Sequence, residues 1–460
     1  MNWSSPTSVA FYTSSDEAGK FQFSVDPIDP ADPYDLMIDD SRHVSDFAPL
    51  LHRNVNDALL TAYQRDWIVA EASRADESAL RDLCIPLNGD GVRKFVGSLR
   101  AAHVLGLGES THGTREFTEL RSRLVEELTH GGWLTTIALE AGWEEVTRLD
   151  DYVRRGEGTG RDAVKSLTYW PWRTEEFLAF VESVRKLNDG LPADKKIEFL
   201  GIDYIPPGAT ADFLRRYFEA AGGAHPDVLS ALDPLRRIGN WLEISKLSLE
   251  ERKELLRALK ELMRVAESQS VISLPTIQGL RITQLIVESH DPEEDFRDRV
   301  MAEAVLVLFS RTDGERRVAI WAHEGHLAEG PIDGRVPMGR YLKMRLAEKY
   351  RAIGTMFHDG SFRVYSGLQG KMVNHVVAPP PPFYLESVMR RVSPSGPCVL
   401  DVTEATRRSH VRDWISVPKH VRIYGGLEIS ESYPWSPVIV PDLWSALIFV
   451  PSTAPTTPLD

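Results

Sequence analysis

The chain has 460 residues, of which 42% are hydrophobic, 26% charged and 9% aromatic. This composition is that of an ordinary globular protein and argues against a collagen-like, repeat-array or largely disordered chain. Lys and Arg total 53, Asp and Glu total 67, and the formal net charge is −14. Electrostatic attraction to nucleic acid or to an anionic membrane is therefore not expected to drive its function.

The N-terminal sequence bears on where the protein is found. Residues 1–20 lack the basic start and the apolar run of a secretory signal. No uninterrupted apolar run reaches the ~18 residues that a membrane span requires. We predict a cytoplasmic protein without a membrane-spanning segment.

The chain is predicted to begin with a flexible arm at residues 1–45, which is rich in Ser, Pro and Asp and whose repeated X-Pro steps exclude a regular helix. Residues 46–450 are predicted to form one α/β domain. Its first apolar runs, at 103–108, 135–139 and 197–202, predict strands that alternate with helices.

The sequence after each of these strands is helical. Residues 117–128 place apolar side chains on one helical face, and Thr174 is the predicted N-cap of a later helix. An almost continuous helical pattern at 209–311 predicts a helical insertion, which a fourth buried strand follows at 318–322. Shorter strands are predicted at 350–356, 362–366 and 373–377, and near Val399, Val421 and Leu447. Because the first four strands are apolar along their whole length, we predict an open, mostly parallel sheet with helices on both faces.

Polar side chains follow each of the four buried strands. They are Glu109, Ser110 and His112 after the first, Glu140 after the second, Asp203 after the third, and His323, Glu324 and His326 after the fourth. Ligands of open α/β sheets bind beyond the carboxyl ends of the strands, so these side chains are expected to converge on one crevice. Imidazole titrates near neutrality and a carboxylate can orient it, which predicts general acid/base chemistry. The alternative is that polar residues simply mark the strand ends.

The segment Gly106–Gly113 approaches two known motifs without matching either. A dinucleotide fingerprint requires a glycine where Thr111 stands, and Glu109 would oppose a pyrophosphate. A nucleophile elbow around Ser110 requires a glycine where His112 stands. Neither a nicotinamide cofactor nor a serine nucleophile is favoured.

Metal ligands are equally poorly represented. Cys84 and Cys398 are far apart and have no further cysteine or close histidine to complete a zinc cluster. The segment His323–His326 is one residue short of the His-Glu-x-x-His zinc helix. We predict no metal site and no cofactor.

Six motifs in the chain resemble the erythromycin esterase family in order and approximate spacing, over roughly residues 90–450. They lie at 108–117, 139–141, 172–176, 297–303, 321–326, and 338–342 with 352–354. Two positions depart from the family pattern. Members commonly read Ala-His-Asn-x-His and Met-Ala-x-Asn, whereas here Glu324 and Ala304 replace the two asparagines.

The resemblance implies a metal-independent hydrolase that opens a macrolide lactone with a histidine-activated water and forms no covalent intermediate. It also implies the site residues. His112 matches the general base, Glu109 and Glu140 its supporting carboxylates, and Arg115 a cleft arginine. The second histidine motif is formed by His323 and His326.

We therefore assign catalysis to His112, Glu109, Glu140 and His323, and substrate binding to Arg115, Arg173, His326 and Trp172. A protonated His323 or Arg115 is expected to stabilise the oxyanion. Simpler roles stay open: Arg115 and Arg173 can form ion pairs with Glu119 and Glu176, and Trp172 can pack in the core.

The sequence thus predicts a hydrolase that cleaves an ester or lactone of a natural product. Its expected partner is a small-molecule or peptide natural product. The resemblance implies a role in antibiotic resistance or in natural-product biosynthesis, since many members of the family are not resistance enzymes and some accompany biosynthetic gene sets. One alternative is a tailoring enzyme that performs cyclisation, elimination or acyl transfer with the same base. Another is a non-catalytic protein that binds small molecules.

Overall fold

The computed structural model of the chain describes residues 72–269, 274–289, 296–310, 316–332, 334–425 and 437–459. It also describes three short strands, β1 (Asp39–Asp40), β2 (His43–Ser45) and β3 (Ala62–Gln64), which pair antiparallel. The chain divides into two compact units, Met1–Ile68 and Val69–Asp460. Apart from β1 and β2, the predicted arm at 1–45 lies outside the described residues.

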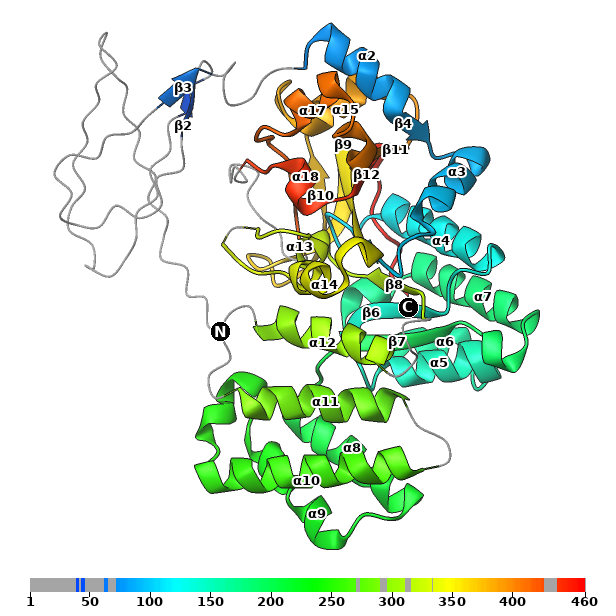
Figure 1. Cartoon of the computed structure of the whole chain (residues 1–460), viewed down its shortest axis with the longest axis vertical. Coiled ribbons are helices and arrows are strands. Elements are labelled where there is room, and N and C mark those ends of the chain that lie inside the picture. Colours follow the sequence, from blue (N-terminus) through cyan, green and yellow to red (C-terminus); the bar gives the residue numbers. More distant parts are fainter. Residues whose placement is uncertain are drawn as a thin grey trace, which may run out of the picture. The chain divides into compact units, whose positions relative to one another are not determined.

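The strands of the second unit are β4 (Cys84–Pro86), β5 (Val104–Leu107), β6 (Thr136–Gly142), β7 (Glu198–Asp203), β8 (Val318–Trp321), β9 (Tyr350–Ser366), β10 (Lys371–Val377), β11 (Cys398–Asp401) and β12 (Ala446–Thr453). In the described part of this unit they form one nine-stranded sheet (Figure 1). The order is β4-β11-β12-β9-β5-β8-β6-β7, and β10 pairs with β9. Pairing from β12 through to β7 is parallel, whereas β4, β11 and β10 are antiparallel additions. The predicted open, mostly parallel sheet is confirmed, with β5 near its centre.

Two layers of helices cover the sheet because its buried strands are apolar on both faces. On β5, Leu105 and Leu107 belong to one hydrophobic cluster and Val104 to the other. The first cluster is covered by α3 (Gly89–Leu99), α4 (Arg115–His130), α5 (Val146–Arg155), α6 (Gly160–Lys165) and α7 (Glu175–Asp189). The second is covered mainly by α12 (Phe296–Ser310), α14 (Met338–Leu346), α15 (Leu385–Val392), α16 (Val402–Ala405), α17 (Ser409–Ile415) and α18 (Val440–Leu443).

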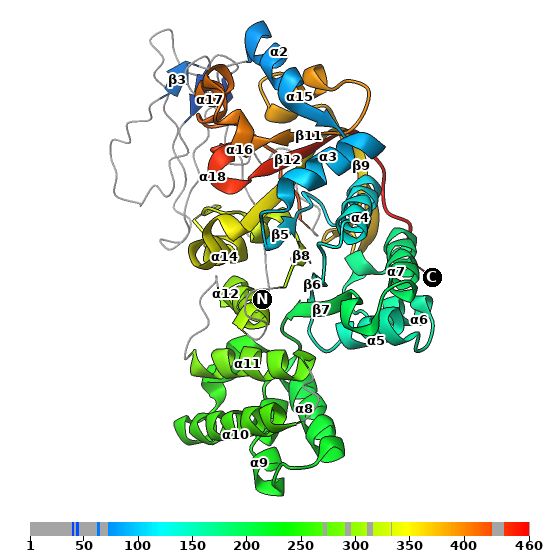
Figure 2. The same ribbon diagram turned by 45° about the vertical axis from the view of Figure 1, so that its right-hand side comes forward.

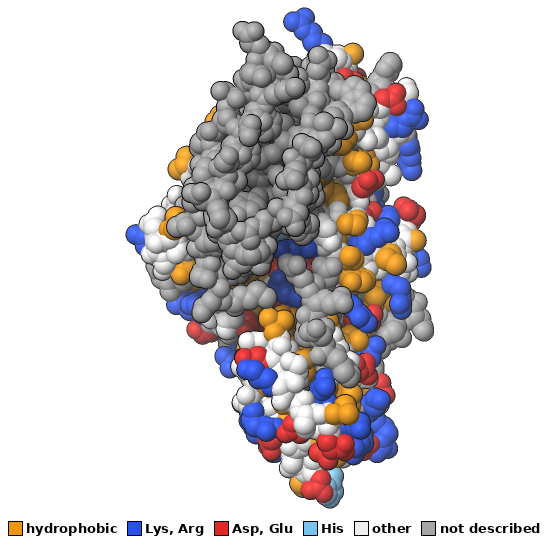
Figure 3. All heavy atoms as spheres, turned by 90° about the vertical axis from the view of Figure 1, so that its left-hand side faces the viewer, with side chains coloured by type: hydrophobic (Ala, Val, Ile, Leu, Met, Phe, Trp, Pro, Cys, Tyr) orange, Lys and Arg blue, Asp and Glu red, His pale blue; other side chains and the backbone are white. Residues whose placement is uncertain are grey.

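Between β7 and β8 the chain is helical. Here lie α8 (Pro207–Ala221), α9 (Pro226–Ser230), α10 (Leu249–Ser268) and α11 (Leu274–Glu288), which pack together, while α12 lies between them and the sheet (Figure 2). On the face drawn in Figure 3, acidic and basic side chains are interspersed over this helical region. Among the described helices, none is both long enough and apolar enough to cross a membrane.

Two strand predictions differ from the structure. The runs predicted at 350–356 and 362–366 form a single strand, β9, which bends at Gly360 (φ 120°). A side chain there would overlap the backbone of Thr453 on β12, so glycine is required where β9 leaves β12 and continues into the hairpin with β10. The strand predicted near Val421 is wrong. Val421 is a buried residue of an irregular segment.

We expect Gly113→Ala to destabilise the fold by about 1–3 kcal/mol, because the added methyl group would overlap the carbonyl of Arg363 in β9. The matched control is Gly97→Ala on an exposed position of α3, where the new methyl group has no neighbour and helix propensity favours alanine by about 1 kcal/mol. Urea unfolding of both variants measures the difference. Equal stability of the two variants would contradict the close approach at Gly113.

Candidate functional site

The loop after β5 holds a buried histidine–carboxylate pair. His112 Nδ1 lies 2.8 Å from Glu109 Oε1, and both side chains are at least nine-tenths buried. The loop is fixed by two backbone donors, since Gly108 donates to the carbonyl of Ile353 and Ser110 to Thr355 Oγ1 at 2.7 Å. Because Nδ1 faces a carboxylate, it carries the proton, and Nε2 is left as the basic nitrogen.

A buried arginine balances the charge of Glu109. Arg121 on α4 donates from Nη2 to Glu109 Oε2, and its guanidinium lies 4.4 Å from the ring centre of Trp321 on β8. Burial lowers the pKa of Arg121, and the charge of Glu109 opposes that effect. Glu109 therefore binds a cation through one oxygen and orients His112 through the other.

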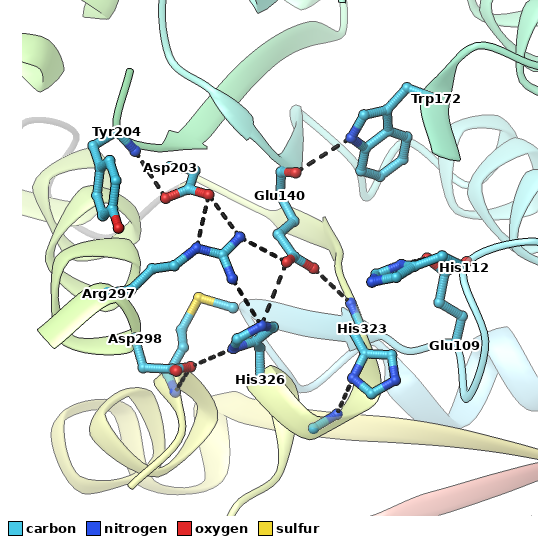
Figure 4. A network of polar contacts seen from close by, with 12 residues as sticks. Glu109, His112, Glu140, Trp172, Asp203, Tyr204, Arg297, Asp298, His323 and His326 are labelled. Atoms are coloured by element: carbon cyan, nitrogen blue, oxygen red, sulfur yellow. Dashed lines mark hydrogen bonds and ion pairs between the residues drawn. The ribbon is translucent and has the colours of Figure 1, made fainter. Parts of the chain in front are cut away.

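A second network joins β6, β7 and α12 through Arg297 (Figure 4). Arg297 donates from Nη2 to Glu140 Oε1 at 2.8 Å and to Asp203 Oδ2 at 2.6 Å. Its Nη1 lies 3.1 Å from Nε2 of His326, whose Nδ1 lies 2.8 Å from Asp298 Oδ1. As predicted, residues that follow or end β6, β7 and β8 therefore lie together.

The charges of this network fix the protonation of Glu140. Burial alone would raise the pKa of Glu140, but His326, Arg297 and the backbone N–H of His323 hold it well below its usual value. The pKa of His326 is raised. Burial would lower it, and the carboxylates of Glu140 and Asp298 outweigh that effect. Glu140 is thus an anion at neutral pH, and the cationic form of His326 is favoured.

His323 lies between the two networks. Its ring centre is 5.1 Å from that of His112 and 6.4 Å from that of His326, and its backbone N–H donates to Glu140 Oε2 at 2.8 Å. Burial, followed by the charges of His112 and His326, lowers the pKa of His323 to about 3. The expectation of a protonated His323 is therefore wrong. As N-cap of α13 (Glu324–Leu327), its Nδ1 accepts from the N–H of Gly325, which leaves the proton of the neutral ring on Nε2.

Glu324, where the family pattern has asparagine, is fully buried. Its Oε2 accepts from the backbone N–H of Thr355 at 2.6 Å and from Thr355 Oγ1 at 3.2 Å. Burial raises the pKa of Glu324 to about 8, despite the hydrogen bonds from Thr355. The side chain is therefore a neutral acid at pH 7, and through Thr355 it supports the loop that carries His112.

Aromatic side chains flank His112 on the exposed side of the site. The ring centres of Tyr169 and Trp170 lie 5.6 and 6.4 Å from that of His112, both edge-on. Arg363 of β9 lies 5.7 Å from the ring centre of Trp170. Burial and the charge of Glu140 raise the pKa of Tyr169, so its hydroxyl stays protonated. These two aromatic residues form an apolar wall beside the basic nitrogen of His112.

Trp172 occupies a different position from the one predicted. It is 4% exposed, packs against Phe177 and Trp321, and donates from Nε1 to the carbonyl of Glu140 at 3.2 Å (Figure 4). A side chain this deeply buried offers no surface to a substrate. Trp172 is a core residue that supports β6.

The two arginines assigned to substrate binding lie outside both networks. Arg115 is 44% exposed at the start of α4 and pairs with Glu116 and Glu119, and Arg173 is also exposed. The arginines within the networks are instead Arg121, which is buried, and Arg297, which is one-third exposed. The sequence pattern could have identified Arg121 as a buried residue, because it interrupts the apolar stripe of α4 at a position that faces the core.

Among the described residues, no group of three or more His, Cys, Asp or Glu side chains is arranged to hold a metal ion. The acidic groups of the site are occupied by arginine, histidine or backbone N–H donors. Fold and site together define an α/β protein of the open-sheet class with linked histidines, carboxylates and arginines at the carboxyl ends of its parallel strands.

Comparison with known proteins identifies the family. Residues 131–453 match the family model described as erythromycin esterase. The erythromycin esterase type II of Escherichia coli is 25% identical over 309 aligned positions, and the match covers 58% of this chain and 71% of that protein. The chain belongs to the erythromycin esterase family.

Solved structures share the fold. A Bacillus cereus protein has a TM-score of 0.72 at 18% identity, over 83% of this chain and 98% of its own. A mutant of the erythromycin esterase EreC in its open conformation has a TM-score of 0.58 at 16% identity, over 81% of this chain and 96% of its own.

We expect Glu324→Gln to remove a pH dependence of stability. In the unfolded chain the carboxyl titrates near 4.5, whereas in the folded chain its pKa is raised to about 8. As pH rises between these values the unfolded state loses a proton that the folded state keeps, so the free energy of unfolding falls. Relative to wild type, Glu324→Gln should gain on the order of several degrees in Tm between about pH 5 and about pH 8.

Calorimetry at the two pH values measures this change, and the exposed Glu348→Gln is the control. A Tm difference between Glu324→Gln and wild type that is the same at both pH values would show that Glu324 is ionised in the folded state.

Proposed function

We propose that the protein is a hydrolase that cleaves an ester or lactone bond of a small natural product, using a water molecule that His112 activates. The observation that carries the proposal is the His112–Glu109 pair, with its 2.8 Å contact at Nδ1 and its charge balanced by buried Arg121. Membership of the erythromycin esterase family and the name of the Escherichia coli relative support the choice of bond.

The proposed chemistry is direct hydrolysis. His112 Nε2 takes a proton from water as the water oxygen bonds to the carbonyl carbon of the substrate. The π electrons of the carbonyl bond move to the carbonyl oxygen. The tetrahedral intermediate then re-forms the carbonyl, the carbon–oxygen bond to the leaving group breaks, and the imidazolium returns its proton to the leaving alkoxide. Glu109 keeps the ring in the required tautomer and stabilises its cationic form.

The negative charge of the intermediate requires donors that exist at neutral pH. We assign this role to the neutral Nε2–H of His323 and to the guanidinium of Arg297 across the site, in place of Arg115. The side chain of Arg297 is one-third exposed. One such donor typically accounts for about 3 kcal/mol of transition-state stabilisation.

Tyr169 and Trp170 are the proposed apolar wall for the substrate, in the role that the sequence assigned to Trp172. The proposed reaction uses no metal ion. In the described residues the side chains of the site bind one another in charge-balanced pairs, and none forms a ligand group for a metal.

We expect hydrolysis of a macrolide lactone or a simple ester by the purified chain. Mass spectrometry after incubation with erythromycin, other lactones and aryl esters should show a product heavier by one water molecule for a lactone, or the acid and alcohol for an open ester. A product of unchanged mass, or one that has lost water, would favour the tailoring reactions instead. Binding of a lactone without conversion would favour a non-catalytic protein.

We expect His112→Ala to lower kcat by about 10²–10⁴-fold, because the general base is lost, and to leave KM within a few-fold of wild type. His130→Ala is the control, since His130 is exposed at the far end of α4. Steady-state kinetics on the substrate found above provide the measurement. Near wild-type turnover by His112→Ala would exclude water activation by this residue.

A further inference from the structure

The segment that follows β12, residues 454–459, crosses the starts of α4 and α7. At α4 the N–H of Arg115 donates to the carbonyl of Ala454 at 3.0 Å, and the N–H of Ala454 donates to Glu116 Oε2 at 2.8 Å. The N–H of Thr456 then donates to the carbonyl of Gly113 at 2.9 Å. Three hydrogen bonds therefore join Ala454 and Thr456 to the start of α4 and to Gly113, the residue after His112.

The same arrangement recurs at α7, three residues further along the segment. The N–H of Glu175 donates to the carbonyl of Thr457 at 2.9 Å, and the N–H of Thr457 donates to Glu176 at 3.0 Å. The N–H of Leu459 then donates to the carbonyl of Arg173 at 2.9 Å. In each case a threonine is the N-cap, the next amide donates to the segment, and a glutamate at the second helical position accepts from it.

The two prolines of the segment suit it to these two sets of hydrogen bonds, because they have no N–H with which to pair with a further strand. Pro455 and Pro458 occupy the middle position of each triplet and are the bridge partners of Thr114 and Thr174. Proline has no N–H and a fixed φ, so the segment enters these contacts pre-extended and loses less conformational entropy. The first amide of a helix has no partner within the helix, and in α4 and α7 it donates to this segment.

The two loops that the segment connects belong to the two sides of the site. Gly113 directly follows His112. Arg173 follows η1 (Trp170–Trp172), whose Trp170 ring lies against His112 and whose Trp172 donates to the carbonyl of Glu140. A displacement of either loop changes the separation between the basic nitrogen and the aromatic wall.

We propose that residues 454–459 are a positioning segment of the active site, and that Glu116 and Glu176 are the positioning residues that hold it. The inference rests on the proposed function only in taking His112 as the base. Glu116 and Glu176 act through the backbone of the segment and do not contact the reacting atoms.

The double variant Glu116→Ala/Glu176→Ala removes both side-chain acceptors. We expect kcat to fall about 10–100-fold, because misplacement of a catalytic group by about 1 Å has an effect of that size, while KM changes little. Glu116→Gln/Glu176→Gln keeps an acceptor oxygen at each position and should recover most of the rate. Glu119→Ala, one turn further along α4 and exposed, is the matched control and should retain wild-type kcat.

A second readout does not depend on hydrolysis. In full-length protein with ¹³C-labelled histidine, the resonance of His112, assigned by its loss in His112→Ala, should shift in the double alanine variant and not in Glu119→Ala. A chain that ends at Thr453 should show the same shift, and a synthetic peptide of residues 454–459 added in trans should reverse it.

Unchanged kcat together with an unchanged His112 resonance in the double alanine variant would overturn the proposal. If the double alanine variant no longer unfolds cooperatively, the glutamine double variant and the peptide experiment decide instead. A His112 resonance that the added peptide does not restore would then overturn the proposal. A shifted resonance in a protein that hydrolyses neither erythromycin nor p-nitrophenyl butyrate supports the positioning segment and counts against the esterase function alone.

Discussion

The charge of the buried carboxylate of Glu109 has to be balanced, and the rest of the site is arranged around that requirement. Leaving such a charge unpaired costs about 3–5 kcal/mol. Arg121 supplies the balance from α4, and its guanidinium lies on Trp321 of β8. One ion pair therefore ties together the loop after β5, the helix that follows it and the neighbouring strand. The carboxylate oxygen that Arg121 does not bind is the one that orients His112.

In the second network, the charges of two carboxylates are balanced by one arginine. Glu140 and Asp203 share one guanidinium, that of Arg297, so two carboxylates at adjacent strand ends are held by one cation from α12. His326 lies beside this guanidinium and has Asp298 as its own partner. His323, between the two networks, is kept neutral by burial and by the histidines on either side. The site thus has the His112–Glu109 pair on one side, the Arg297 network on the other, and the neutral ring of His323 between them.

Much of this was predictable because strand ends are set by local pattern. The apolar runs locate β5, β6, β7 and β8, and the parallel order then brings His112, Glu140 and His323 to one edge. The positions of Arg121 and Arg297 could not be predicted from the strand ends. Arg297 comes from a helix and lies 94 positions beyond Asp203 in the sequence. Arg115 and Arg121 both belong to α4, and only the helix face on which each lies distinguishes the exposed arginine from the buried one. The sequence likewise does not show which tryptophan of η1 is buried. The path of η1 places Trp172 in the core and leaves Trp170 partly exposed.

Glu324 shows how a departure from the family pattern can be accommodated. An asparagine is neutral at every pH, whereas a glutamate here is neutral only because burial and the nearby charges of Glu386 and Glu109 oppose its ionisation. The neutral acid still accepts from the backbone N–H of Thr355, and Thr355 in turn accepts from Ser110 in the loop that carries His112. At neutral pH the protonated Glu324 therefore keeps these hydrogen bonds beneath the loop that carries His112. A glutamate here also means that alkaline pH introduces a negative charge beneath that loop, directly behind the carboxylate that orients His112.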